Sequence, residues 1–117
     1  MRELRAVFLL DAPGRVERIE LQLDALDRAR LPSERAAAIA AAAYETHSLS
    51  GASATLRLEP LATQLERLEL ALRDRKAESD GPSSAARARE LLGTIAALVA
   101  ELALQAGVIT EPRTAHA

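Results

Sequence analysis

The 117-residue chain has no cysteine, and its only aromatic side chains are Phe8 and Tyr44. Without cysteine it has no disulfide, no thiol nucleophile and no cysteine-ligated metal. Its histidines are His47 and His116, too few and too far apart to predict a histidine metal cluster. The sequence also has no glycine-rich phosphate loop and no nucleophile elbow. The residue inventory therefore gives no basis for a metal cluster, a phosphate-binding loop or a nucleophile of the hydrolase type.

The sequence also has no large excess of charge of one sign and no long hydrophobic run. Fifteen basic residues stand against seventeen acidic ones, and the net charge is −2. With no basic tract and almost no aromatics to stack on bases, nucleic-acid binding is not expected. The longest apolar run, residues 36–44, is too short to span a bilayer, and residues 1–5 lack the apolar core of a signal peptide. These absences predict a cytoplasmic protein that does not associate with membranes.

Alanine and leucine are abundant, with 26 and 20 copies respectively. Both are strong helix formers, whereas the β-branched residues that favour strands are scarce. A chain of this size buries roughly 65% of its unfolded surface, which is enough for a core without disulfides. We expect one helical domain over residues 1–107, followed by a tail over residues 108–117.

Helix signals divide the N-terminal part into two predicted helices. Leu4, Val7 and Phe8 are the apolar group of a short helix that stops near Asp11. Asp11 and Pro13 then have the pattern of an N-cap and a first-turn proline, so a second helix is expected to begin there. Its apolar positions recur at spacings of three and four until it ends near Ala29: Val16, Ile19, Leu23 and Leu26.

Three further helices are predicted. The first runs from Ser33, an expected N-cap, to about Leu56, with Ile39, Ala42, Thr46, Leu49, Ser53 and Leu56 as its inward stripe. The next begins at Glu59 and has a heptad-like seam of Leu61, Leu65, Leu68 and Leu72. Turn residues at 76–84 precede the last helix, which Gly107 ends. Together these elements predict an all-α, antiparallel up-and-down four-helix bundle with a short extra N-terminal helix.

His47 is the side chain to which chemistry can be assigned. It lies about 160° around the helix from Leu49, so it faces outward when Leu49 faces the core. Gly51, one turn later, costs about 1 kcal/mol relative to alanine. Such a glycine indicates close approach, either of a partner or of a second alanine-rich helix. The histidine shares its face with Ala40, Ala43, Tyr44, Ser50, Gly51 and Ala54, which are small apart from the tyrosine. On spacing alone, however, a solvated side chain is the default interpretation of His47.

Glu69 is predicted at the edge of the leucine seam, where an antiparallel helix would bring it level with His47. Its carboxylate could accept a hydrogen bond from Nδ1 of the imidazole, which would leave the lone pair of Nε2 free to attack. The alternative is that Glu69 only pairs with Arg73, its neighbour at i+4.

Residues 46–56, Thr-His-Ser-Leu-Ser-Gly-Ala-Ser-Ala-Thr-Leu, resemble the His-x-Leu-Lys-Gly-small-Ala-x-x-Leu-Gly signature of histidine phosphotransfer (HPt) domains. The resemblance extends over about residues 4–105, and Glu69 matches a glutamate that contacts the histidine in the chemotaxis-kinase branch. It implies a phosphocarrier, not an enzyme, in a His–Asp phosphorelay, with His47 as the phosphorylated nucleophile. It also implies that Glu69 and Ser50 lie beside the histidine and that partners dock on Ala43, Tyr44, Ser50, Gly51 and Ala54.

The partners that this resemblance implies are response-regulator receiver domains and a sensor histidine kinase. His47 would accept the phosphoryl group from a receiver or kinase and pass it to a receiver aspartate. The receiver would supply the Mg²⁺, so the chain itself needs no cofactor. A monomer is favoured, although the alanine-rich surfaces allow a dimer.

Two positions depart from the family pattern. Ser50 stands where the family has a lysine, and a serine cannot offset the charge of nearly −2 on a phosphoryl group. Arg57 stands where the family often has glycine, and at about 15 Å along the helix it cannot replace the lysine. Arg73 is expected near Ala43 and is the weaker candidate for compensation. Two other functions therefore stay open: a relative that docks receivers without passing phosphate, and an unrelated helical adaptor.

Overall fold

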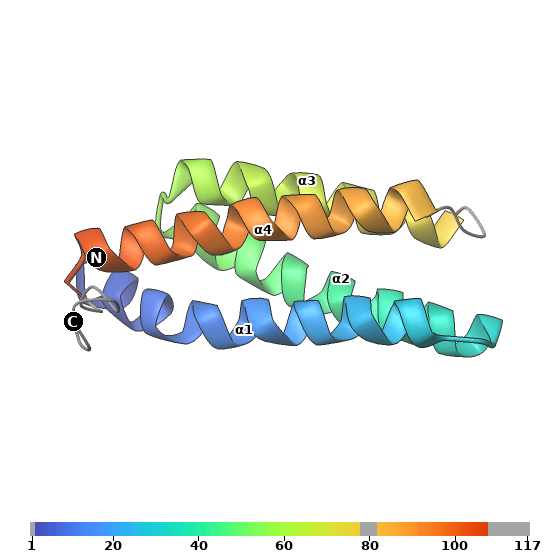
Figure 1. The fold of residues 1–117 in the computed structure, drawn as a ribbon. Coiled ribbons are helices and arrows are strands. Elements are labelled where there is room, and N and C mark those ends of the chain that lie inside the picture. The colour runs from blue at the N-terminus through green and yellow to red at the C-terminus, as the bar shows by residue number, and fades with distance from the viewer. Residues whose placement is uncertain (1, 78–81, 108–117) are drawn as a thin grey trace.

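The structure, a computed structural model, describes residues 2–77 and 82–107. In this part the chain forms four α-helices: α1 (Arg2–Arg28), α2 (Pro32–Thr55), α3 (Glu59–Ala77) and α4 (Pro82–Gln105). They run alternately in opposite directions (Figure 1), each packs against its neighbours in sequence, and α4 packs against α1. The predicted all-α, up-and-down bundle is thus confirmed.

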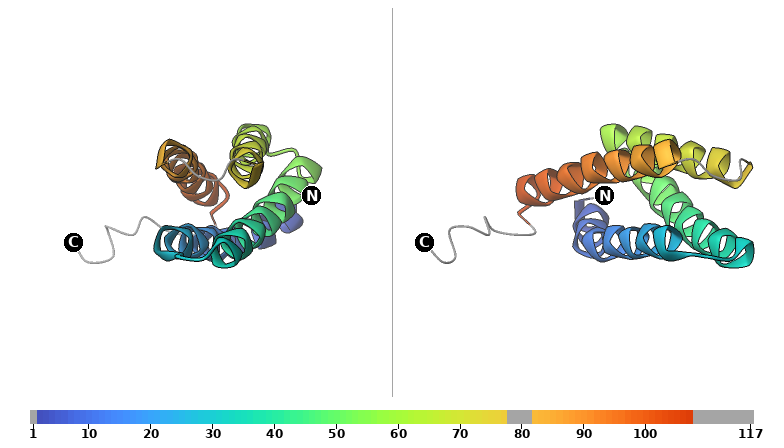
Figure 2. Two further views of the ribbon diagram at one scale, coloured as in Figure 1. Left: turned by 90° about the vertical axis from the view of Figure 1, so that its right-hand side faces the viewer. Right: turned by 45° about the vertical axis from the view of Figure 1, so that its right-hand side comes forward.

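Helix α2 crosses the bundle obliquely. Its N-terminal half lies beside α1 and its C-terminal half lies beside α3 (Figures 1 and 2). One side of α2 is therefore covered by α1, another by α3, and a third side faces solvent. The middle of α2, where the two coverings overlap, is where the sequence places His47.

The prediction of a separate short N-terminal helix is wrong, because α1 is continuous from Arg2 to Arg28 with Pro13 inside it. An interior proline costs about 3 kcal/mol. A single helix, however, places Phe8, Leu9 and Ala12 in the core at 9%, 2% and 0% exposure. Burying a large apolar side chain gains about 1.5–3 kcal/mol, so two of them offset the proline.

Continuity of α1 also changes which of its first residues are buried. Leu4 and Val7, predicted to lie on the apolar face, are 61% and 63% exposed. The helical phase that buries Val16 and Ile19 turns Leu9 and Ala12 inward instead.

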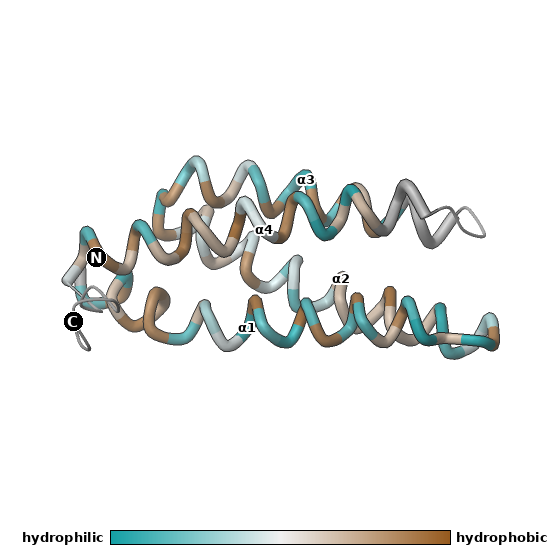
Figure 3. Tube along the Cα trace, in the orientation of Figure 1, coloured by the Kyte–Doolittle hydropathy of each residue, from teal (hydrophilic) through white to brown (hydrophobic). Residues whose placement is uncertain are grey.

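The remaining apolar faces agree with the predicted stripes. Apolar residues recur along the helices in Figure 3, and one core cluster joins all four of them. The four leucines of the α3 seam are each 0% exposed. In α2 the whole predicted stripe is buried, including Thr46, whose hydroxyl donates to the Ala42 carbonyl at 2.7 Å.

The start of α2 is capped differently from the prediction. The N-cap residue is Leu31, not Ser33, and Pro32 occupies the first helical position, where a missing N–H is harmless. The Glu34 carboxylate accepts hydrogen bonds from the backbone N–H groups of Arg30 at 2.9 Å and Leu31 at 3.1 Å. These two bonds hold the pKa of Glu34 below its usual range. The glutamate therefore performs the capping that we had expected of the serine.

The other helix boundaries are as follows. Helix α3 continues to Ala77 and α4 begins at Pro82, so both helices extend into the predicted turn at 76–84. Gly107, two residues after the end of α4, has φ 75°, which agrees with the predicted stop. The predicted tail, residues 108–117, lies outside the described residues. Within those residues, no helix is both long enough and apolar enough to span a membrane.

The C-terminus of α2 shows why the family signature has glycine where this chain has Arg57. Arg57 has φ 61°, a left-handed conformation that costs a non-glycine residue about 1–2 kcal/mol. The N–H of Leu58 donates to the Ser53 carbonyl at 2.9 Å, and that of Arg57 donates to Ala54 at 3.1 Å. This is the hydrogen-bond pattern of a Schellman motif, whose left-handed position normally holds glycine.

We therefore expect Arg57→Gly to raise the stability of the fold by up to about 1 kcal/mol, because glycine adopts this conformation without strain. Thermal unfolding followed by circular dichroism measures the effect. Arg57→Ala is the matched control, since it removes the side chain but keeps the strain. Equal stabilisation by alanine and glycine would contradict the explanation.

Candidate functional site

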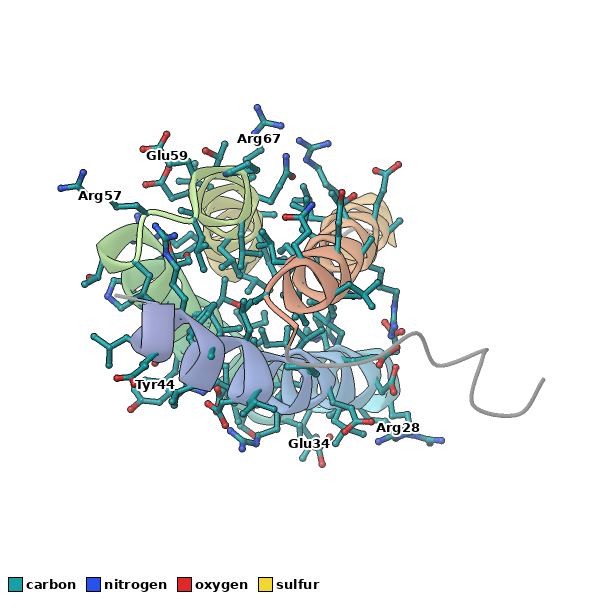
Figure 4. The ribbon with its side chains drawn as sticks, turned by 90° about the vertical axis from the view of Figure 1, so that its left-hand side faces the viewer. Arg28, Glu34, Tyr44, Arg57, Glu59 and Arg67 are labelled. Atoms are coloured by element: carbon teal, nitrogen blue, oxygen red, sulfur yellow. The ribbon has the colours of Figure 1, made fainter. Side chains whose placement is uncertain are left out.

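The site is centred on His47 in the middle of α2, with its side chain 76% exposed. The buried arc of this helix, which includes Leu49 at 1% exposure, points away from it. Residues of the predicted strip surround the imidazole: Ala40, Tyr44, Gly51 and Ala54 are all exposed. Tyr44, at 73% exposure, projects outward from the bundle (Figure 4).

Two members of the predicted docking strip are not on this open surface. Ser50 is only 9% exposed and Ala43 is half-buried against the core. The packing of the bundle around α2 therefore removes both of them from the open surface. The expectation that Ser50 is open to a partner is therefore wrong. The exposed strip consists of Ala40, Tyr44, His47, Gly51 and Ala54, and we call it the His47 strip.

Glu69 reaches the histidine from α3. Its Oε2 lies 2.8 Å from Nδ1 of His47. A carboxylate can only accept, so this hydrogen bond places a proton on Nδ1 and leaves the Nε2 lone pair free when the ring is neutral. Glu69 itself is 15% exposed, whereas the ring that it holds is 76% exposed. The arrangement thus presents an oriented nitrogen nucleophile to the outside.

Arg73 completes the cluster. Its NH2 group lies 3.2 Å from the same Oε2 of Glu69 that contacts His47. The two pairings that the sequence presented as alternatives are therefore both present. From the sequence, Arg73 was the weaker candidate to compensate for the missing lysine, because an antiparallel helix places its backbone near Ala43 and not beside His47. The i+4 spacing from Glu69 was the signal that its long side chain could reach back.

The opposite flank of the histidine is held by ion pairs between α1 and α2. Arg15 donates to the Ser48 hydroxyl at 3.1 Å and lies 3.8 Å from a carboxylate oxygen of Glu45. Arg18 lies 3.4 Å from the other oxygen of Glu45. These contacts join α1 to the segment of α2 that carries His47. They hold that segment against α1, so the face of α2 that bears His47 stays turned toward solvent.

The glycine of the strip has no structural reason to be glycine. A Cβ built on Gly51 would meet nothing within 4 Å, so close packing of a second helix of this chain, one of the two explanations above, is wrong. The other explanation, approach by a partner, is the one that the open space permits. Gly93 in α4 has equally open surroundings and provides a matched control.

Gly51→Ala is expected to stabilise the fold by about 0.5–1 kcal/mol, because helix interiors favour alanine. If the phosphotransfer implied by the family resemblance takes place at His47, Gly51→Leu should leave the fold intact but slow transfer from a phosphorylated receiver at least tenfold, because its side chain blocks close approach. Melting curves and a transfer assay measure the two effects. Gly93→Ala should give the same stabilisation, and Gly93→Leu should leave transfer unchanged. Normal transfer in Gly51→Leu would exclude close docking at this glycine.

Fold and site together define a class of protein, namely a four-helix bundle that displays one exposed histidine oriented by a carboxylate. The comparisons with known proteins agree. The model of the Hpt domain matches residues 3–105, and the chain therefore belongs to the Hpt domain family. No curated protein matches the chain, and no solved structure does.

Membership of this family gives the general role. Hpt domains serve histidine phosphotransfer in two-component phosphorelays, as phosphocarriers rather than as catalysts. They interact with receiver domains and histidine kinases. In the described residues, no group of three or more histidine, aspartate or glutamate side chains could hold a metal ion.

Proposed function

We propose that this protein carries a phosphoryl group on Nε2 of His47 between receiver domains, or between a kinase and a receiver. The observation that carries the proposal is the 2.8 Å contact between Nδ1 of His47 and Oε2 of Glu69. It supports a ring that is oriented, in a single tautomer and open on its Nε2 side.

In the loading step, Nε2 attacks the phosphorus of a receiver's aspartyl phosphate. The Nε2–P bond forms while the O–P bond of the acyl phosphate breaks, and the aspartate leaves as a carboxylate. The Nδ1 proton stays on the ring, which becomes a phosphoimidazolium. Unloading is the reverse, with the aspartate of a second receiver attacking the phosphorus and Nε2 recovering its lone pair. Neither direction requires a proton to leave the imidazole.

Glu69 has two tasks in this mechanism. It holds the ring so that Nε2 points outward, which contributes through positioning. Its negative charge also faces the positive charge that develops on the imidazole as the Nε2–P bond forms, so it stabilises the transition state more than the ground state. The Mg²⁺ that neutralises the transferring phosphoryl group belongs to the receiver, and no cofactor is assigned to this chain.

The His47 strip is the proposed docking surface. Its exposed members other than Tyr44 and His47 itself are alanine and glycine, so a partner's backbone can come close to the imidazole. Close approach is needed because the attacking and leaving atoms must lie in line with the phosphorus. An exposed tyrosine at the rim offers an amphipathic contact of the kind enriched in interfaces.

The proposal is tested by adding the protein to receiver domains phosphorylated with a small phosphodonor and Mg²⁺. Mass spectrometry at alkaline pH, which preserves phosphohistidine, is expected to find the phosphate on His47. Absence of label from receivers verified as phosphorylated would overturn the carrier function. Binding of those receivers without label would instead support the docking-only relative, for which Ser50 in place of lysine is the supporting observation.

A further inference from the structure

Once phosphorylated, the site carries more negative charge than its phosphoimidazolium ring can balance. A phosphoryl group on Nε2 brings a charge of nearly −2 to a ring whose other nitrogen already faces the Glu69 carboxylate. Ser50, at the position of the family's lysine, is neutral and 9% exposed. A cation from elsewhere in the chain must therefore balance these charges, or phosphorylation is disfavoured by repulsion.

Arg73 is placed to provide it. Its NH2 group lies 3.2 Å, and Nδ1 of His47 lies 2.8 Å, from the same oxygen of Glu69, so the two nitrogens are no more than 6.0 Å apart. The Arg73 side chain is 66% exposed and can change rotamer. A guanidinium has five N–H donors, and those not used by Glu69 are available to phosphoryl oxygens.

The other described arginines considered for this role are placed differently. Arg15 already lies 3.3 Å from Asp11 and 3.8 Å from Glu45. Arg57 and Arg67 both project outward from the bundle (Figure 4), and Arg57 lies in the turn that follows α2. Arg73 is the arginine bonded to the carboxylate that holds the imidazole.

We infer that Arg73 does the electrostatic work of the absent lysine, by pairing with Glu69 in the free protein and with the phosphoryl group once Nε2 is phosphorylated. The inference rests on the proposed function of His47. Arginine suits this exchange, because its planar fork binds both carboxylates and phosphates. The cation is thus supplied from α3 rather than from the position three residues after the histidine.

The probe for the test is potassium phosphoramidate, which loads histidine without a receiver. Nε2 attacks the phosphorus, the P–N bond of the donor breaks, and ammonia leaves. We expect Arg73→Ala to lower the loading rate at least about threefold, the effect of one unit charge at about 6 Å in water, because Arg73 must approach the phosphoryl group more closely than its 6.0 Å limit from Nδ1. The loss should shrink at high salt, because exposed charges are screened. Arg73→Lys should load within twofold of the wild type.

Three further measurements separate charge from structure. Arg67→Ala, an exposed arginine of the same helix, should load normally. Ser50→Lys should restore loading when combined with Arg73→Ala and change it little in the wild type. The imidazole tautomer, read by ¹⁵N NMR, should remain Nδ1–H in Arg73→Ala, because Glu69 still holds the ring.

Normal loading in Arg73→Ala, an equal loss in Arg67→Ala or a changed tautomer in Arg73→Ala would each overturn the inference. So would a wild type that phosphoramidate does not load on His47. If the wild type loads with phosphoramidate but accepts nothing from phosphorylated receivers, the proposed carrier function fails. The role of Arg73 is then still decided by the loading rates.

Discussion

His47→Gln is expected to abolish all acid-labile phosphate on the protein while leaving the fold unchanged. The glutamine amide nitrogen has no nucleophilic lone pair, so no group remains at this position that can attack phosphorus. Because the histidine is 76% exposed, its replacement should change the free energy of unfolding by no more than about 0.5 kcal/mol. Label transferred from phosphorylated receivers, together with a thermal melt, measures both effects.

The matched control is the other histidine of the sequence. His116→Gln should accept phosphate at the wild-type rate. Label that persists in His47→Gln, or that is lost only when His116 is replaced, would contradict the assignment of the nucleophile.

Glu69→Ala is expected to slow loading of His47 about ten- to hundredfold, the effect of removing a carboxylate that orients the imidazole of a metal-binding histidine. Without it, the ring can rotate, the Nδ1–H tautomer loses its preference, and no negative charge faces the developing imidazolium. Stability should change little, since an ion pair to an arginine that is 66% exposed is worth about 0–1 kcal/mol. Rapid-quench transfer kinetics and ¹⁵N NMR of the imidazole measure the two consequences.

Two variants divide the role of Glu69 into its parts. Glu69→Gln keeps an acceptor oxygen but no charge, so we expect a rate between those of the wild type and Glu69→Ala. Glu66→Ala removes an exposed carboxylate one turn earlier in α3 and should transfer normally. An unaltered rate in Glu69→Ala would remove this residue from the mechanism. Equal losses of rate in Glu69→Ala and Glu66→Ala would show that the net negative charge of α3 matters and not the contact with His47.

The sequence predicted the inward faces of the helices well but misread α1. Periodicity is a local property, and it placed the α3 leucines and the α2 stripe correctly because each helix needs one apolar face. Asp11 and Pro13 are also a local signal, and they pointed to a helix start. Burial of Phe8 and Leu9 outweighed that signal, and such burial exists only once α1 packs against its neighbours.

The site shows the same division. The outward direction of His47 follows from its angle to Leu49, and Glu69 was expected level with it because antiparallel helices pair in register. The burial of Ser50 could not be read from α2 alone, since it depends on how the other helices pack around α2. The Glu69–Arg73 pair follows from the i+4 spacing, but the meeting of Arg73 and His47 on one oxygen of Glu69 depends on how α3 packs beside α2.

By itself, then, the sequence determined a four-helix bundle, an outward histidine with an open glycine one turn later, and a carboxylate able to reach it. These follow from residue type and from the angle between residues on one helix. Only the tertiary structure decided that α1 runs through Pro13, that Ser50 is closed to partners, and that Arg73 shares an oxygen with His47. The physical reason is that these features depend on the packing of one helix against another, which sets burial and side-chain direction together.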